Sequence, residues 1–285
     1  MFPEDIRIPL EGWVNDGLDW LVVGYGDYFD AINRFILSFL IQIEWALRTL
    51  PWWVITVLIA GLAFHATRNW KLPATVVVGL VLIGTLGLWD LAMQTMALML
   101  LAVIISILIG VPTGVLMANS DTLRKIMRPM LDAMQTLPPF VYLVPAVMLF
   151  GLGKVPAIVA TVIYAVPPLV RLTDLGIRLV DAEVMEASRA FGTGKFKQLM
   201  KVQLPLAMPN IMAGINQCTM MALGMVVIAS MIGARGLGEH VLVGIQRLDV
   251  GKGLAGGIGI VVLAVIFDRI TQAYGARQMQ HSGKD

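Results

Sequence analysis

The amino-acid sequence predicts an all-α polytopic membrane protein. Of its 285 residues, 58% are hydrophobic and only 14% are charged, whereas soluble domains carry about a quarter charged residues. Several runs approach or exceed about 18 apolar residues, the length at which a helix spans the hydrocarbon of a bilayer. The single cysteine, Cys218, lies in an apolar segment, so we expect a buried thiol and no disulfide within the chain.

An acidic region, residues 1–50, precedes the spans, and we expect it to lie on the extracytoplasmic side of the membrane. It holds eight acidic and three basic residues and has no basic start before an apolar core, so we expect no cleaved signal peptide. Its apolar run 35–50 is interrupted by polar and charged residues, which favours an interfacial amphipathic helix over a span. Trp52 and Trp53 then mark a membrane boundary, because indole rings favour the headgroup level.

About seven spans are predicted after this region. We place them at about 52–68, 72–89, 91–117, 133–151, 154–172, 209–232 and 254–270. The fourth should begin irregularly, because Pro138, Pro139 and Pro145 each remove a backbone donor, and such backbone is tolerated at membrane depth only inside protein or beside a cavity. We interpret 51–90 as two accessory helices added to a five-helix core at 91–285.

The distribution of basic residues predicts the orientation. Placing 173–205 in the cytoplasm puts fourteen Lys and Arg residues inside and seven outside. Because cytoplasmic loops carry the excess of positive charge, we predict that the N-terminus is outside and the C-terminus inside.

Between two spans lies a polar segment, residues 182–205, which we call the knob. Asp181 is a good N-cap for a first helix, and Gly192 can adopt the left-handed conformation of a C-terminal cap. Thr193 is expected to cap a second helix that Pro205 ends. These signals predict two short helices at 182–201.

One face of the first knob helix is small at its centre and aromatic at its end. Ala187, Ser188 and Phe191 share it by helical spacing, which suits a protein interface. A helix lying flat on its own membrane domain explains the same pattern about equally well.

A motif in the knob resembles the cytoplasmic coupling motif of ABC importer permeases. The matching positions are Glu186, Ala187, Gly192, Val202, Leu204 and Pro205, with Ser188 in place of a second alanine. The resemblance implies that the knob, including Phe191, docks into a groove on a separate ATPase subunit.

Other segments resemble glycine betaine and proline betaine permeases of the ProW and OpuAB type. They are 7–10, 132–146, 201–217, 226–238 and 267–272. The resemblance implies a type I importer (MetI-like) transmembrane fold in the bacterial cytoplasmic membrane. It also implies a homodimer, two ABC ATPase subunits, an extracytoplasmic betaine-binding protein and uptake of compatible solutes.

We expect no cofactor and no enzyme activity in this chain, and no nucleic-acid partner. The glycine-rich stretch 251–259 lacks the G-x-x-x-x-G-K-[ST] order of a phosphate loop, so ATP and Mg²⁺ should bind the partner subunit. His240, His281 and Cys218 are too scattered for a metal site.

Polar residues inside the spans are candidates for a solute path. They are Gln135, Thr136, Tyr142, Asn216, Thr219 and Ser230. Hydrogen bonding between helices is the competing explanation. The outer loop 233–250 has a helical repeat, which indicates either a gate and docking surface or a plain interfacial helix.

Alternative functions remain open. The solute could be choline, carnitine or another small molecule such as an amino acid. An ion-coupled secondary transporter is disfavoured, because the spans hold almost no ionisable residue. A membrane scaffold or sensor would show no vectorial transport.

Overall fold

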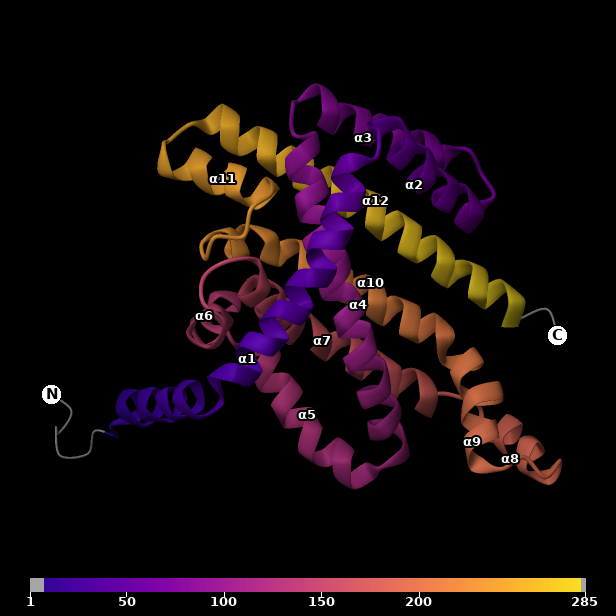
Figure 1. Ribbon diagram of the computed structural model, residues 1–285. Coiled ribbons are helices and arrows are strands. Elements are labelled where there is room, and N and C mark those ends of the chain that lie inside the picture. The colour runs from indigo at the N-terminus through magenta and orange to yellow at the C-terminus, as the bar shows by residue number, and fades with distance from the viewer. Residues whose placement is uncertain (1–7, 283–285) are drawn as a thin grey trace, which may run out of the picture.

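A computed structural model describes residues 8–282, and every regular element in that range is helical. Several residues used in the sequence argument lie outside the described residues: Glu4 and Asp5 of the acidic region, Arg7 of the segment 7–10, and Lys284 of the charge count. Long helices cross one another at the centre of the molecule, and short helices occupy its periphery (Figure 1).

The first helix, α1, is longer than the amphipathic helix predicted at 35–50. It extends over Leu10–Thr49, with a kink at Tyr25, where φ is −129° and ψ is 16°. The part before the kink projects away from the other helices (Figure 1). The part after it packs along α4, where Leu40 is completely buried. Pro51 follows, and α2 (Trp52–Thr67) leaves at 107° to α1.

The next helix, α3 (Lys71–Thr85), forms a hairpin with α2. Val76, Leu80 and Ile83 share a buried apolar cluster with Leu263 and Ile266 of α12. The pair at 51–90 therefore packs on the last helix of the chain, and its description as an accessory unit stays an interpretation.

Helix α7 is the centre of the core. It packs against both α4 and α10, and 67% of its most apolar stretch is buried, compared with 22% in α12. Small residues permit the close approach: a Cβ at Gly114 of α4 would lie 2.5 Å from the Cβ of Thr173. The core helices are α4 (Trp89–Asn119), α7 (Lys154–Arg178), α10 (Leu204–Ser230) and α12 (Val250–Ser282).

The span predicted at 133–151 is broken and is not one continuous helix. α5 (Asp121–Thr136) ends before Pro138, a 3₁₀ turn η2 (Pro139–Tyr142) follows, and α6 (Leu143–Phe150) leaves at 108° to α5. The expected irregular start is confirmed. Its cause is that a proline disfavours helical backbone in the residue before it.

Among residues 8–282, four single helices are long and apolar enough to cross a membrane. They are α4, α7, the continuous run Lys195–Ser230 and α12; the bent pairs α1 with α2 and α5 with 139–150 raise the number to six if each is one span. Helix α3 has only 15 residues. The count of seven spans and the orientation of the chain stay predictions.

Candidate coupling surface and solute path

The knob lies at one end of α10. It consists of α8 (Ala182–Ala190), α9 (Lys195–Gln198) and a π-helical turn η3 (Leu199–Gln203) that continues into α10. In Figure 1, α8 and α9 form a lower extremity of the molecule, and α11 (Leu237–Gln246) lies toward the other end of α10. The knob therefore projects from the helical body.

The caps predicted for the first knob helix are confirmed. The Asp181 carboxylate accepts a hydrogen bond of 2.9 Å from the N–H of Glu183, and Gly192 has a φ of +75°. The N–H of Gly192 donates to the carbonyl of Arg189 (2.9 Å), and the N–H of Thr193 donates to that of Ser188 (3.2 Å). These are the two bonds of a Schellman motif.

Two predictions about the second knob helix are wrong. The N-cap is Gly194, not Thr193. Pro205 does not end the helix, because α9, η3 and α10 form one run over Lys195–Ser230. Pro205 lies in the first turn of α10, directly after the π-helical turn η3. A π turn shifts the hydrogen-bonding pattern, and it thereby accommodates a residue that has no N–H.

The knob has one buried polar contact that the sequence argument missed. Gln198 is 4% exposed, and its Nε2 donates to the carbonyl of Met185 at 2.8 Å. This bond joins α9 to α8. In the sequence, this contact is indicated by the position of Gln198 among the apolar residues Phe196, Leu199 and Met200.

Most of the knob surface is exposed. Phe191 is 89% exposed and Phe196 is 74% exposed, and α8 contains no buried residue. Glu186, Ala187 and Pro205 are exposed as well, whereas Ser188 and Leu204 are half-buried. A helix lying flat on its own domain would cover its apolar side, so the exposure of these aromatic rings favours a partner surface.

Three lysines of the knob are exposed. They are Lys195 and Lys197, on either side of Phe196 in the sequence, and Lys201, and we call them the lysine rim. Charged residues beside exposed apolar ones are the general arrangement of a protein interface.

The candidate path residues on the broken segment lie close together. The Tyr142 hydroxyl donates to the carbonyl of Met134 on α5, and the ring packs with Met225 of α10. Thr136 donates to the carbonyl of Ala133 at 3.0 Å. Gln135 is half-buried, and its side chain has no hydrogen-bond partner among the described residues.

The candidates on α10 do not join this group. Thr219 and Ser230 are buried and donate to carbonyls of their own helix, those of Ile215 and Val227. Asn216 donates to Asp268 of α12 at 2.9 Å. Hydrogen bonds within α10 thus account for Thr219 and Ser230, and a bond to α12 accounts for Asn216. The path through all six residues stays a prediction.

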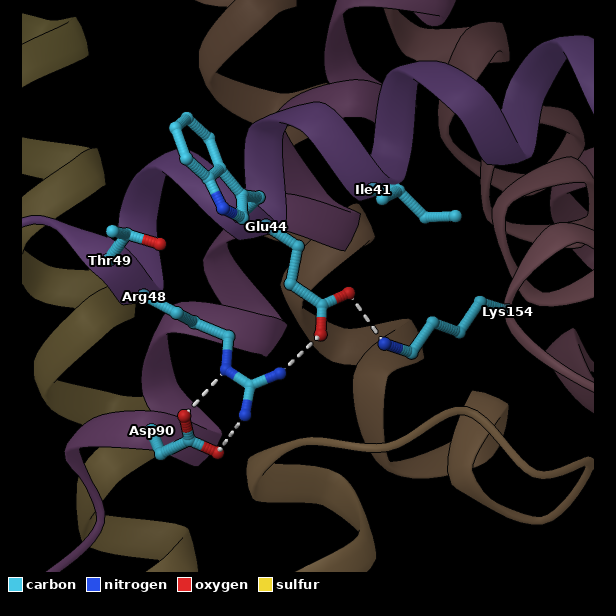
Figure 2. Close-up of a pocket in the computed structure, with 7 residues that line it drawn as sticks. Ile41, Glu44, Arg48, Thr49, Asp90 and Lys154 are labelled. Carbon is cyan, nitrogen blue, oxygen red and sulfur yellow. Dashed lines mark hydrogen bonds and ion pairs between the residues drawn. The ribbon is translucent and has the colours of Figure 1, made fainter.

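A network of ion pairs connects three helices at the other end of the core (Figure 2). Glu44 of α1 accepts from Lys154 at the start of α7 (2.6 Å) and from Arg48 (3.2 Å). Arg48 also donates to Asp90 in the first turn of α4 (2.6 Å). The charges line a cavity of about 490 Å³.

This network was not foreseen from the sequence. Glu44 and Arg48 were interpreted only as interruptions of an apolar run, and Lys154 lies 110 positions after Glu44. The Glu44 side chain is only 11% exposed, so its charge requires partners. The two cations supply them.

The helix predicted within the loop 233–250 is confirmed as α11. The N–H of Leu237 donates to Thr95 of α4 at 2.9 Å. Burial, followed by the charge of Lys252, lowers the pKa of His240, while Asp249 and Glu239 oppose the shift. The loop is therefore packed on the core, and a role as a gate stays a prediction.

The arrangement of core helices defines the class of protein. The solved MetNI methionine ABC transporter, captured in inward-facing conformations, contains a chain with a TM-score of 0.57 to this protein. The match covers 69% of this chain and 96% of that chain at 24% identity. The fold is thus that of the MetI-like transmembrane subunits of ABC transporters.

The chain belongs to the family described as binding-protein-dependent transport system inner membrane components, which matches residues 107–280. It is a multi-pass membrane protein and a transport subunit of an ABC transporter, not an enzyme.

Two curated relatives extend the likeness to the whole chain. The glycine betaine/proline betaine permease ProW of Escherichia coli is 50% identical over 94% of this chain and 75% of ProW. The glycine betaine/carnitine permease GbuB of Listeria monocytogenes is 45% identical over 96% of this chain and 98% of GbuB.

Proposed function

We propose that this chain is the permease subunit of an ABC importer for glycine betaine, proline betaine and related compatible solutes. A separate ATPase subunit binds ATP and Mg²⁺ and drives transport through the knob. An extracytoplasmic binding protein delivers the solute.

The observation that best supports this substrate class is the 50% identity to ProW over 94% of this chain. The family match, over residues 107–280, includes the broken segment at η2 and the start of α10. The fold likeness to the methionine transporter gives no support to an amino-acid substrate, because it rests on 24% identity.

Carnitine is the second candidate solute. The name of GbuB includes it, and GbuB is almost as similar to this chain as ProW. Glycine betaine and carnitine both carry a trimethylammonium group and a carboxylate, so an aromatic site for the cation would accept either. An uptake assay with labelled glycine betaine and unlabelled carnitine, choline or proline betaine as competitors shows which of these solutes the transporter accepts.

The assembly that we propose contains two copies of this chain and two ATPase subunits. Each knob would bind one ATPase, with Phe191 in an apolar pocket and the lysine rim against acidic residues. ATP binding closes the ATPases, the knobs follow, and the paired membrane domains alternate between outward-facing and inward-facing states. Glu186, Ala187, Ser188, Phe191, Gly192, Leu204 and Pro205 are the proposed coupling residues.

The replacement Phe191→Ala tests this role. The ring is 89% exposed, so its removal should leave the thermal unfolding temperature of the chain unchanged. Loss of a central aromatic anchor costs about 2 kcal/mol or more at an interface, which weakens ATPase binding by about thirtyfold.

A matched control comes from the opposite end of the core. Leu152 is 77% exposed and lies beside Gly153, whose N–H donates to the carbonyl of Ile232 just beyond α10. The variant Leu152→Ala should bind the ATPase normally. Equal affinities for both variants would contradict the assignment of the knob as the ATPase contact.

A further inference from the structure

Three arginines gather where α4, α5 and α7 meet, in a place that neither the coupling role nor the solute path uses. Arg124 and Arg128 lie on α5, and Arg171 lies on α7. They line a cavity of about 320 Å³, which we call the arginine pocket. Its lining residues are Met117, Arg124, Arg128, Asp132, Arg171, Asp174 and Leu175.

The carboxylates of the pocket engage only part of these guanidinium groups. Asp174 is 3% exposed. It accepts hydrogen bonds from Nε of Arg124 at 2.9 Å and from Nε of Arg178 at 3.0 Å. Arg178 does not line the pocket. Asp132 accepts from Arg171. Both carboxyl oxygens of Asp174 are thus occupied, and the other N–H groups of Arg124 and Arg171 have no protein acceptor among the described residues.

Arg128 is the most available group. No hydrogen bond or ion pair joins it to any residue in the described range. Three positive charges face two negative ones in the lining, so the pocket carries one excess positive charge. The partial negative charge at the end of α7 accounts for a cation such as Arg178 in its last turn, but not for Arg128 in the interior of α5.

Apolar surface borders the pocket. Met117 of α4 and Leu175 of α7 line the pocket, and Leu175 is 41% exposed. Basic pockets between membrane helices bind lipid headgroups. A guanidinium group recognises a phosphate oxygen pair through two parallel N–H donors.

We propose that the arginine pocket binds a phosphate group, with Arg128 as the principal ligand and Arg124 and Arg171 as supporting donors. A lipid headgroup or a dissolved phosphate offers the same chemistry. Leu175, the last lining residue on α7, precedes the first residue of the knob, Ala182, by seven positions in the chain.

The test is binding of phosphatidylglycerol to the purified full-length chain, measured by native mass spectrometry and by the rise in unfolding temperature. Arg128→Gln should weaken binding by about tenfold, because it removes a charge-assisted pair. Lys125→Gln is the matched control: Lys125 is exposed, as Arg128 is, and carries the same charge on the same helix, but it does not line the pocket.

A second variant should strengthen binding. Misfolding can explain a loss of binding in Arg128→Gln, but it cannot explain a gain. Asp132→Asn removes a competing carboxylate and releases Arg171, and we expect tighter binding than in the wild type. Binding should also weaken at high salt in every variant, because counterions screen the charges.

Dissolved inorganic phosphate distinguishes the source of the ligand. Stabilisation by phosphatidylglycerol alone supports a lipid site, and equal stabilisation by millimolar phosphate supports a site for a soluble anion. The proposal is overturned if neither probe stabilises the chain. It is also overturned if Arg128→Gln binds like Lys125→Gln, or if Asp132→Asn binds no more tightly than the wild type.

Discussion

Gly192 carries the backbone turn that ends the first knob helix. Its φ of +75° is unfavourable for any residue with a Cβ, and nothing lies within 4 Å of the place a Cβ would occupy. Gly192→Val therefore acts through backbone strain alone, which costs about 1–2 kcal/mol. We expect ATPase binding to weaken about five- to thirtyfold, as measured by titration with the purified partner.

Asparagine at the same position is the control for this prediction. It tolerates the left-handed conformation better than other non-glycine residues, so Gly192→Asn should retain most of the affinity. An equal loss in the valine and asparagine variants would mean that side-chain volume, rather than the turn, matters at the docking surface.

His240 of α11 should make stability depend on pH. Because burial lowers its pKa below 6.5, the unfolded chain binds a proton more readily than the folded chain at slightly acid pH. Stability then rises with pH in this window: the contribution is complete above pH 6.5 and is lost as the pH falls toward the lowered value. Unfolding temperatures from pH 5 to 8 should show this slope in the wild type but lack it in His240→Gln.

At the scale of helices, the contact between α4 and α7 depends on Gly114. A methyl group there would meet Thr173 at 2.5 Å and the carbonyl of Val170 at 2.8 Å, so the helices must separate. We expect Gly114→Ala to destabilise the protein by about 1–3 kcal/mol, measured by thermal or denaturant unfolding. Gly61→Ala in α2, where a Cβ meets nothing within 4 Å, should be neutral or stabilising.

In the ion-pair network that joins α1 to α4 and α7, we expect the buried carboxylate to contribute more to stability than the exposed one. The Glu44 side chain is 11% exposed, whereas that of Asp90 is 56% exposed. Glu44→Gln should cost about 1–3 kcal/mol of stability, since it leaves two cations short of a partner. Asp90→Asn should cost at most about 1 kcal/mol, because water screens exposed pairs. The reverse order in unfolding measurements would contradict the role of Glu44 as the hub.

Local signals in the sequence predicted individual helices and their caps well. They did not predict whether one helix continues into the next. The caps at Asp181 and Gly192 depend on neighbouring backbone groups, so residue type and spacing were sufficient. Pro205 was misjudged because a π turn before it, which no local pattern indicates, lets the helix continue. The bend after α5 followed from its prolines, but its angle depends on packing against α7 and α10.

Contacts between distant segments were beyond the reach of sequence reasoning. The Glu44–Lys154 pair and the arginine pocket each join helices far apart in the chain, and neither has a local signature. The polar residues of α10 illustrate the converse: Thr219 and Ser230 attracted notice in an apolar span, yet their hydrogen bonds are to their own helix.

For the whole molecule, we propose that the membrane helices form the solute path and that the exposed knob binds an ATPase, which is a separate chain. The family match and the relatives support an importer of this design. The chain by itself should therefore neither hydrolyse ATP nor accumulate solute.

The most direct test is uptake of labelled glycine betaine into liposomes that contain this chain, its ATPase subunit and its binding protein. We expect accumulation only when ATP is present on the ATPase side and all three components are included, and we expect Phe191→Ala to abolish most of it. Accumulation driven by an ion gradient without the ATPase, or unchanged uptake in Phe191→Ala, would contradict the claim that the knob couples ATP hydrolysis to import.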